Sequence, residues 1–252
     1  MNPMDLTGKR ILVTGASSGI GQSCAIMAAD LGATVILTGR RAAALDNTRT
    51  SMKNPSDHLC TSVDLFSADA VEQLVSFATK AGKLDGIIHA AGLEVAAPIK
   101  MTDVNDARRL YEVNCLAFLA LVKACAGRRT ANEGFSSVVV SSVAAFAGWS
   151  GVSAYAASKG AVSACVRALA MELAPKGYRV NAVCPANIRT PMFERLTEML
   201  DETSVRSAIL SKQPLGIGIP SQVASAVCFL LSSAASFITG VNLPVDGGYL
   251  AH

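Results

Sequence analysis

Charged residues are scarce in this sequence: Asp, Glu, Lys and Arg together make up 16 % of its 252 residues, where roughly 25 % is usual for a globular domain. Hydrophobic residues account for 51 %, a composition that excludes a disordered chain. The most apolar runs, 113–126 and 223–233, are shorter than the ~18 residues of a membrane span. The low charge therefore indicates that much of the surface is covered, either by helices on both faces of a sheet or by other subunits.

Clusters of one charge are also absent. The 22 basic and 19 acidic residues are spread along the chain and give a net charge of +3. A nucleic-acid partner, which would require a basic patch, is therefore not expected. The N-terminal segment has no secretory apolar region and enters a strand by Arg10, so we expect a cytoplasmic protein.

The sequence contains no Cys-x-x-Cys motif. Its seven cysteines are far apart and mostly in apolar runs: Cys24, Cys60, Cys115, Cys125, Cys165, Cys184 and Cys228. This pattern is typical of reduced core residues, the alternative being that one acts as a ligand or nucleophile. We expect no metal site.

Short β-branched runs alternate with longer helical patterns along the whole chain. The predicted strands are 10–14, 34–38, 58–63, 86–89, 137–141, 179–183 and 242–245, and the predicted helices are 19–31, 41–53, 67–81, 103–127, 153–174 and 220–232. Several strands are apolar throughout, as strands covered on both faces are. The alternation predicts an α/β fold, a doubly wound parallel sheet of about seven strands. No linker divides it, so residues 1–252 are predicted to form a single domain.

A long excursion, 186–218, interrupts the alternation after the sixth strand. Such an insertion at the carboxyl end of a parallel strand commonly covers a ligand. Its helix-spaced apolar stripe consists of Met192, Phe193, Leu196, Met199 and Leu200. The stripe could form a mobile lid over an apolar substrate or pack on the core, and the sequence leaves both possibilities open.

A glycine-rich loop follows the first strand, in the sequence Thr-Gly-Ala-Ser-Ser-Gly-Ile-Gly at 14–21. Gly15 would permit the tight turn, Gly19 a close approach to a phosphate, and Gly21 close packing of helix on strand. The unpaired N–H groups of the next helix would bind a pyrophosphate. A plain turn is the alternative, but the position after the first strand favours a dinucleotide site.

The end of the second strand indicates which dinucleotide. An NAD site usually has a carboxylate there for the ribose 2′-hydroxyl, whereas an NADP site has an arginine. This chain has Arg40 and Arg41 and no acid. Cations are poorly placed at a helix N-terminus unless an anion binds them, so the pair favours NADP(H) over NAD(H).

The predicted helix at 153–174 carries Tyr155 and Lys159, four residues apart and therefore on one face. A nearby ammonium favours the phenolate, which proton transfer to or from an alcohol oxygen requires. Ser141 and Ser142 end the fifth strand, where a hydroxyl could bind the same oxygen. A Tyr/Lys pair alone is commonly an ordinary helix face, but the serine and the upstream glycine loop favour a catalytic group.

These motifs resemble the short-chain dehydrogenase/reductase family over nearly the whole chain. The matching positions are TGASSGIG at 14–21, Asp64, Asn114, SSVAAFAG at 141–148, YAASK at 155–159, VNAVCP at 180–185, ITG at 238–240 and VDGG at 245–248. The resemblance implies a Rossmann-like fold and a hydride-transferring oxidoreductase.

The resemblance also implies a role for individual residues. Tyr155 would be the general acid/base, Ser142 rather than Ser141 the donor to the substrate oxygen, and Lys159 the group that holds the nicotinamide ribose and lowers the pKa of the tyrosine. Asn114 would fix a water that links Lys159 to solvent. The expected cofactor contacts are Gly15, Ser17, Ser18, Gly19, Ile20, Gly21, Arg40, Arg41, Asp64, Leu65, Ala91, Gly92, Tyr155, Lys159, Pro185, Ile188 and Thr190.

Two departures from the family pattern stand out. His89-Ala90-Ala91-Gly92 replaces Asn-Asn-Ala-Gly, and Pro185-Ala186 replaces Pro-Gly. We expect His89 to be a hydrogen-bonding core residue rather than a catalytic group. Trp149 could line the substrate pocket or serve packing or an interface, and Asp246 is expected in a turn or a subunit contact.

The sequence thus favours an NADP(H)-dependent carbonyl reductase, or an alcohol dehydrogenase in reverse, with a small-molecule substrate. A 3-oxoacyl-[acyl-carrier-protein] reductase is the alternative within that class, for which Arg128 and Arg129 are weak candidates to attract the acidic carrier. A non-catalytic nucleotide sensor is the alternative from another class. The apolar helices 103–127 and 153–174, which this family commonly packs across subunits, predict a homotetramer, or at least a dimer.

Overall fold

The computed structural model of the chain describes residues 2–66, 68–197, 207 and 209–251. Its centre is a seven-stranded parallel sheet with strand order β3-β2-β1-β4-β5-β6-β7. The strands are β1 (Arg10–Thr14), β2 (Thr34–Gly39), β3 (Leu59–Ser62), β4 (Leu84–His89), β5 (Ala131–Val140), β6 (Arg179–Pro185) and β7 (Asn242–Val245). The predicted α/β class and doubly wound parallel sheet are confirmed.

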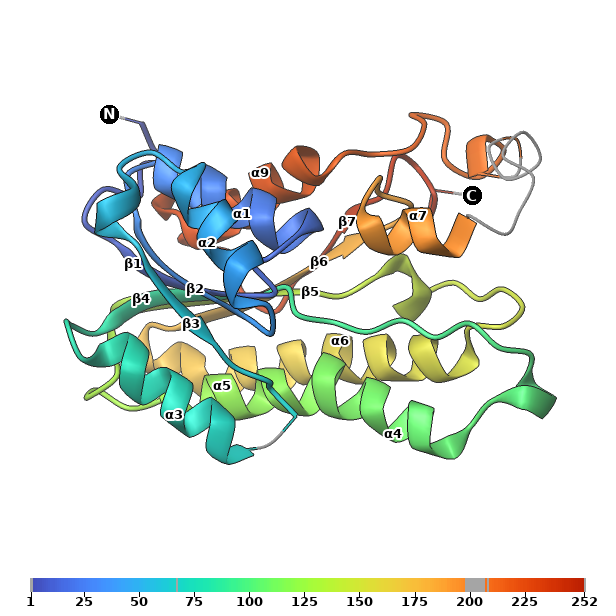
Figure 1. The fold of residues 1–252 in the computed structure, drawn as a ribbon, viewed down its shortest axis with the longest axis horizontal. Coiled ribbons are helices and arrows are strands. Elements are labelled where there is room, and N and C mark those ends of the chain that lie inside the picture. Colours follow the sequence, from blue (N-terminus) through green and yellow to red (C-terminus); the bar gives the residue numbers. More distant parts are fainter. Residues whose placement is uncertain (1, 67, 198–206, 208, 252) are drawn as a thin grey trace.

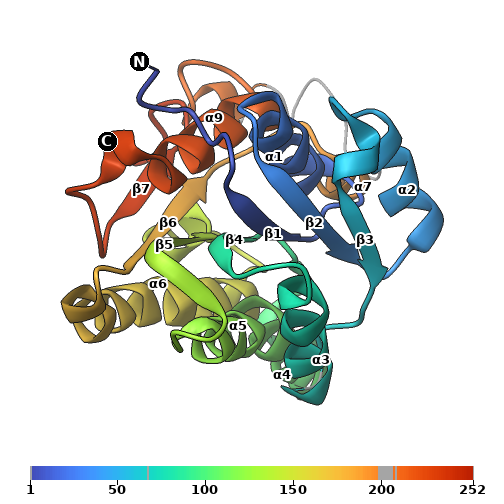
Figure 2. The same ribbon diagram turned by 90° about the vertical axis from the view of Figure 1, so that its left-hand side faces the viewer.

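Helices cover both faces of the sheet (Figure 1). One face carries α1 (Gly19–Asp30), α2 (Ala42–Thr50) and α9 (Pro220–Leu231). The other carries α3 (Ala68–Thr79), α4 (Val104–Tyr111), α5 (Ala117–Cys125) and α6 (Ser153–Leu173), and Figure 2 shows the three layers. Short 3₁₀ turns lie at Pro55–Asp57, Ile99–Met101, Val143–Ala145, Ala174–Lys176 and Ser233–Ala235. Each face has its own apolar core, so the central strands are buried on both sides.

The strand order reverses between β1 and β4. From β1 the chain proceeds outward to β2 and β3, and then returns to β4 on the other side of β1. The crossovers therefore diverge there, and a crevice opens at the carboxyl ends of these two strands.

β5 begins six residues earlier than the predicted 137–141. It starts at Ala131, and its register with β4 shifts between Leu84 and Gly86. Gly134 lies within this irregular part with a φ of 74°, a conformation that glycine adopts without strain. The polar residues there conceal the strand, because the apolar pattern begins only after the bulge.

The predicted helix 103–127 is not one regular helix. A π turn, Glu112–Leu116, lies between α4 and α5 and contains Asn114. A π turn carries one extra residue in the turn and is common at functional sites. Apolar periodicity does not reveal a single added residue.

The excursion 186–218 contains α7 (Pro191–Thr197), which lies beside the carboxyl end of the sheet (Figure 1). A parallel bridge joins Ile188 to Gly218 at its base. Gln213 is 1 % exposed, and its side chain accepts a hydrogen bond from the Asn187 N–H (3.1 Å) and donates to the Gly216 carbonyl. Of the predicted stripe, Met199 and Leu200 lie outside the described residues, as does the side chain of Leu196.

All seven cysteines are free, and five of them are buried. The burial of these five agrees with core positions, whereas Cys60 and Cys165 are only partly buried. Within the described part of the chain no group of three metal-binding side chains occurs, and no helix is long and apolar enough to cross a membrane.

Candidate active site

A cleft of about 1580 Å³ opens at the carboxyl edge of the sheet. The glycine loop after β1 lines it together with residues from β5, α6 and the excursion. Every residue predicted to contact the cofactor lines this cleft, as do Ser142 and Trp149. The fold thus brings into one cavity residues that lie far apart in the chain, such as Gly15 and Thr190.

At Gly15 and Gly19 the glycine loop leaves little room for a side chain. Gly15 has a φ of 67°, and a Cβ there would lie 2.7 Å from the Ala91 nitrogen. Gly19 has a φ of 57°, and its Cβ would lie 3.3 Å from Thr190 Cγ2. Ser18, the N-cap of α1, makes no side-chain cap, and the first turn of α1 has no acidic residue. The N–H groups of this turn therefore face the cleft without a carboxylate, which suits a bound anion.

Arg40 and Arg41 are exposed and line the cleft where β2 meets α2. Arg41 is the N-cap of α2, whose first turn has no acidic residue. Among the described residues neither guanidinium forms an ion pair. Two unpaired cations at the positive end of a helix are electrostatically unfavourable until an anion binds them.

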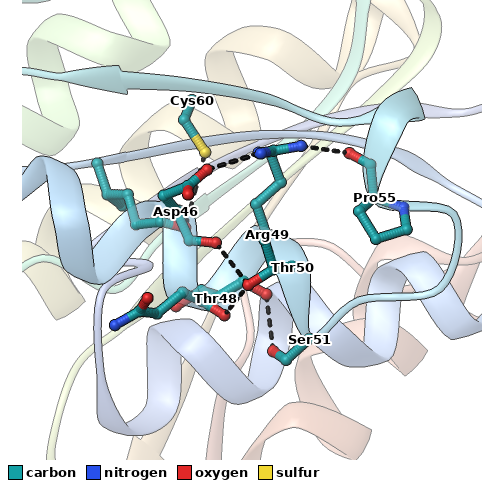
Figure 3. A network of polar contacts seen from close by, with 9 residues as sticks. Asp46, Thr48, Arg49, Thr50, Ser51, Pro55 and Cys60 are labelled. Carbon is teal, nitrogen blue, oxygen red and sulfur yellow. Dashed lines mark hydrogen bonds and ion pairs between the residues drawn. The ribbon is translucent and has the colours of Figure 1, made fainter.

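A polar network at the other end of α2 holds this helix in place (Figure 3). The Arg49 guanidinium forms an ion pair with Asp46 (Nη2–Oδ1, 2.7 Å) and donates to the Pro55 carbonyl (3.0 Å). Thr48 Oγ1 donates to the Ala16 carbonyl (3.0 Å), within the glycine loop. These contacts connect α2, and hence the arginine pair at its start, to the glycine loop.

The two serines at the end of β5 have different partners. Ser141 Oγ contacts Ser163 Oγ (2.7 Å) and donates to the Lys159 carbonyl (3.2 Å), so it is engaged with α6. Ser142 Oγ accepts a hydrogen bond from the Ala144 N–H (3.1 Å) and interacts with the Tyr155 phenol. Ser142 is therefore the serine positioned beside the tyrosine, as the sequence predicts.

Tyr155 and Lys159 are both buried on α6, with 8 % and 5 % of their surfaces exposed. Lys159 Nζ lies 5.7 Å from the Tyr155 ring centroid and donates to the Val140 carbonyl (2.9 Å). Burial lowers the pKa of Lys159 to about 8, while the charge of Glu94 raises it. Because this pKa still lies above 7, the Lys159 amine is mainly protonated at neutral pH.

The pKa of Tyr155 differs from the sequence-based expectation. Burial raises it above its ordinary value, the charge of Glu94 raises it further, and the hydrogen bond with Ser142 lowers it. Lys159 was expected to lower this pKa, but desolvation of the phenolate outweighs any such effect. At neutral pH the Tyr155 phenol is therefore protonated, which suits a proton donor.

Asn114 does not line the cleft. It is 1 % exposed, and its amide contacts the main chain of Leu93 twice, accepting from the N–H (2.8 Å) and donating to the carbonyl (3.0 Å). Its Nδ2 also donates to Ser158 Oγ (2.9 Å). The side chain therefore holds the segment after β4 against α6, and it contacts the cleft only through other residues.

His89 is a core residue, as predicted. Its Nδ1 lies 2.9 Å from Thr14 Oγ1 and its Nε2 lies 3.2 Å from the Val113 carbonyl. Burial lowers its pKa to about 4, so the imidazole is neutral at pH 7. Nε2 carries the proton because a carbonyl can only accept, and Thr14 donates to Nδ1.

The structure also shows the surroundings of Asp246 and Trp149, for which the sequence left alternatives open. Asp246 caps a turn, since its carboxylate accepts hydrogen bonds from the Gly248 N–H (3.0 Å) and the Leu250 N–H (2.9 Å). Trp149 lines the cleft and contacts Tyr249, with ring centroids 6.1 Å apart.

Glu94 and Tyr249 also line the cleft and were not anticipated from the sequence. The available signal for Glu94 was a carboxylate two residues beyond Gly92, at the carboxyl end of a central strand. Tyr249 had no comparable signal, because its position follows only from the path of the C-terminal segment.

Comparisons with known proteins agree with this arrangement. A family model described as "Enoyl-(Acyl carrier protein) reductase", of the short-chain alcohol dehydrogenase type, matches residues 15–250. The 3-oxoacyl-[acyl-carrier-protein] reductase of Rickettsia prowazekii is 35 % identical over 250 residues, which cover 98 % of this chain and 99 % of that protein. The cis-4-hydroxycyclohexanecarboxylate dehydrogenase of Sinomonas cyclohexanicum is 36 % identical and covers 95 % of this chain and 96 % of its own length.

A solved structure from Agrobacterium tumefaciens has the same fold. Described as a putative 2-deoxy-d-gluconate 3-dehydrogenase with bound NADP, it has a TM-score of 0.90 and 32 % identity and covers 100 % of both chains. This chain belongs to the short-chain dehydrogenase/reductase family. As a member it is an oxidoreductase that acts on the CH–OH group of donors.

Proposed function

We propose that this protein catalyses the NADP(H)-dependent interconversion of a small carbonyl compound and its secondary alcohol. The observation that carries the proposal is the convergence of Ser142, Tyr155 and Lys159 in one cleft with the glycine loop and the arginine pair. A nucleotide sensor would not require a serine, a phenol and an ammonium at the far end of its binding cleft.

The residues of the cleft fit a dinucleotide. The glycine loop provides a close approach to main-chain N–H groups at the start of α1, which suits a pyrophosphate. Asp64 and Leu65 would contact the adenine, and Ile188 and Thr190 would contact the nicotinamide; all four line the cleft. When bound, the nicotinamide supplies a hydride to the carbonyl carbon or accepts one from the alcohol carbon.

NADP(H) rather than NAD(H) is the proposed coenzyme. Arg40 and Arg41 are the cations at the end of β2, and neither has an anionic partner among the described residues. A 2′-phosphate would supply that anion. The related structure with bound NADP is consistent with this choice.

The protein residues would move the proton. Tyr155, protonated in the structure, would donate its phenolic hydrogen to the carbonyl oxygen as that oxygen gains charge, and Ser142 would donate a hydrogen bond to the same oxygen. Lys159 would stabilise the phenolate that results. In the oxidation direction Tyr155 would accept the proton of the alcohol.

Proton supply to Lys159 is proposed to pass near Asn114. A Cβ on Gly92 would lie 3.2 Å from Asn114 Oδ1 and 3.6 Å from Lys159 Nζ, so the two side chains flank this glycine. The side-chain amide of Asn114 is already engaged by Leu93 and Ser158. The water relay implied by the family stays a prediction.

The excursion 186–218 is proposed to cover the substrate. Met192 and Phe193 of α7 line the cleft, and the Gln213 side chain holds the base of the excursion to Asn187.

We also propose that the whole chain works as one domain. The cytoplasmic location and the homotetramer stay predictions.

A carrier-bound 3-oxoacyl thioester is the second candidate substrate, favoured by the similarity to the Rickettsia enzyme. Arg128 and Arg129 do not support it, because they precede β5 and so lie at the amino ends of the strands, whereas the cleft lies at the carboxyl ends. Arg109, Arg195 and Lys212 line the cleft and are better placed to contact an acidic carrier.

A carbonyl panel followed by NADPH absorbance tests the proposal. We expect turnover of one class among simple ketones, hydroxy ketones, sugars and acyl thioesters, with NADPH preferred over NADH. Preference for acetoacetyl thioester would select the second candidate. Tight NADPH binding without turnover of any member would refute the proposal and favour a sensor.

A further inference from the structure

Glu94 places a carboxylate in the substrate end of the cleft. It lies two residues beyond Gly92, is partly buried, and lines the cleft together with Tyr155 and Lys159. Burial raises its pKa, and its charge acts on both neighbours by raising the pKa values of Tyr155 and Lys159. The carboxylate therefore shares the cleft with the reacting groups and acts on them electrostatically.

The main chain on both sides of Glu94 is fixed. The side-chain amide of Asn114 binds both the N–H and the carbonyl of Leu93, at 2.8 and 3.0 Å. The Ala97 N–H donates to the Gly151 carbonyl (2.8 Å), which attaches this segment to the loop that carries Trp149. A side chain on a segment held at both ends is positioned before a ligand arrives, as a specific binding group must be.

The carboxylate has no partner within the part of the chain that the structure describes. The two ion pairs found there join Lys9 to Asp85 and Arg49 to Asp46, both away from the cleft, and no hydrogen bond contributes to the pKa of Glu94. Its oxygens are open to the cleft, where a group that donates a hydrogen bond on binding would replace water as their partner.

The neighbouring charges restrict what that donor is. The negative charge of Glu94 disfavours an anionic substrate group in direct contact with it, and the Lys159 ammonium in the same cleft disfavours a cationic one. Arg109, Arg195 and Lys212 also line the cleft, so this restriction applies only to the position beside Glu94. A neutral hydroxyl meets both conditions. The Trp149 and Tyr249 rings, which line the same cleft, offer an apolar surface for the C–H face of a ring or polyol.

We propose that Glu94 accepts a hydrogen bond from a hydroxyl group near the reacting carbon and thereby selects neutral hydroxy ketones and polyols over simple ketones and keto acids. This inference rests on the proposed carbonyl reductase function. Glu94 is then a specificity-determining residue that contacts the substrate, and Asn114 positions it through Leu93.

Matched substrates test the selection. The measured quantity is the ratio of kcat/KM for 2-hydroxycyclohexanone to kcat/KM for cyclohexanone, with NADPH at pH 7.5. We expect the wild-type ratio to exceed one and to fall about 10- to 100-fold in Glu94→Leu, the range for loss of a charge-assisted hydrogen bond. Glu94→Gln, which keeps a carbonyl acceptor, should lie between the two. Fluorescence titration with NADPH checks that each variant is folded.

The control variant is Glu133→Gln, an exposed glutamate in β5 before its bulge, which should leave the ratio unchanged. A second comparison uses 4-oxopentanoate, whose kcat/KM relative to that of 2-pentanone should rise in Glu94→Gln because the like charge is gone. A purely structural role of Glu94 would not produce this rise.

The outcomes that overturn the role of Glu94 differ from those that overturn the proposed function. Wild-type turnover of ketones without a hydroxy-ketone preference, or an unchanged ratio in Glu94→Leu, overturns the inference and leaves the proposed function intact. A wild-type preference for 4-oxopentanoate or for an amino ketone overturns it as well. Absence of turnover with every carbonyl overturns the proposed function, and the inference with it.

Discussion

Acid should destabilise this protein through His89, a buried imidazole at the centre of the sheet. The side chain is 1 % exposed and contacts Thr14 and Val113. Its pKa is lowered from 6.5 to about 4, mainly because burial disfavours the charged form. The unfolded chain therefore binds a proton at a higher pH than the folded chain does.

The direction and size of the effect follow from linkage. The stabilisation is fully present above pH 6.5 and is lost as the pH falls from there to about 4. A difference of about 2.5 units at 1.36 kcal/mol each corresponds to ~3.4 kcal/mol over the whole range, of which ~2 kcal/mol is lost between pH 7 and pH 5.

Urea unfolding at a series of pH values measures this loss. The comparison is with His89→Asn, which restores the residue common in the family and has no titrating group. Wild type should lose ~2 kcal/mol more than the variant between pH 7 and pH 5. Parallel curves for the two proteins would show that His89 is not a buried neutral imidazole, and the reasoning from its burial would be refuted.

Three further predictions concern the coenzyme, the excursion and the assembly. Arg40→Asp should reduce the ratio of kcat/KM with NADPH to that with NADH by about 10- to 100-fold, since a charge-assisted contact is replaced by repulsion; an unchanged ratio would remove the arginine from the 2′-phosphate site. Gln213→Leu should lower the free energy of unfolding by about 1–3 kcal/mol for each buried polar group left unpaired. It should also weaken NADPH binding, because Asn187 loses its hydrogen-bond partner. Unchanged melting and NADPH affinity would contradict that role. Light scattering at micromolar concentration should give about four times the chain mass of 26.0 kDa, because Tyr111 and Met171 leave apolar surface exposed on α4 and α6; a monomer would contradict this.

The sheet was predictable because its signals are local. Runs such as Ile11-Leu12-Val13 are apolar on both faces, and only a covered parallel strand accounts for them. The motifs identified the residues that line the cleft because each is fixed by its place at a strand end or helix start. Gly15, Ser142 and Tyr155 are examples.

The features that escaped prediction depend on distant residues. The extra residue in the π turn at Asn114 does not disturb the apolar pattern around it. The bulge at Gly134 hides the first half of β5. The upward pKa shift of Tyr155 results from burial beneath other elements and from Glu94, which lies 61 positions earlier in the chain. None of these is visible within a sequence window.

The most direct test of the central claim is the rate of NADPH-dependent ketone reduction by Tyr155→Phe. The substitution removes only the phenolic hydroxyl, so NADPH affinity should be retained while kcat falls by about 10²- to 10⁴-fold, the range for loss of general acid catalysis. Wild-type kcat in this variant, with NADPH bound as before, would contradict the assignment of Tyr155 as the proton donor.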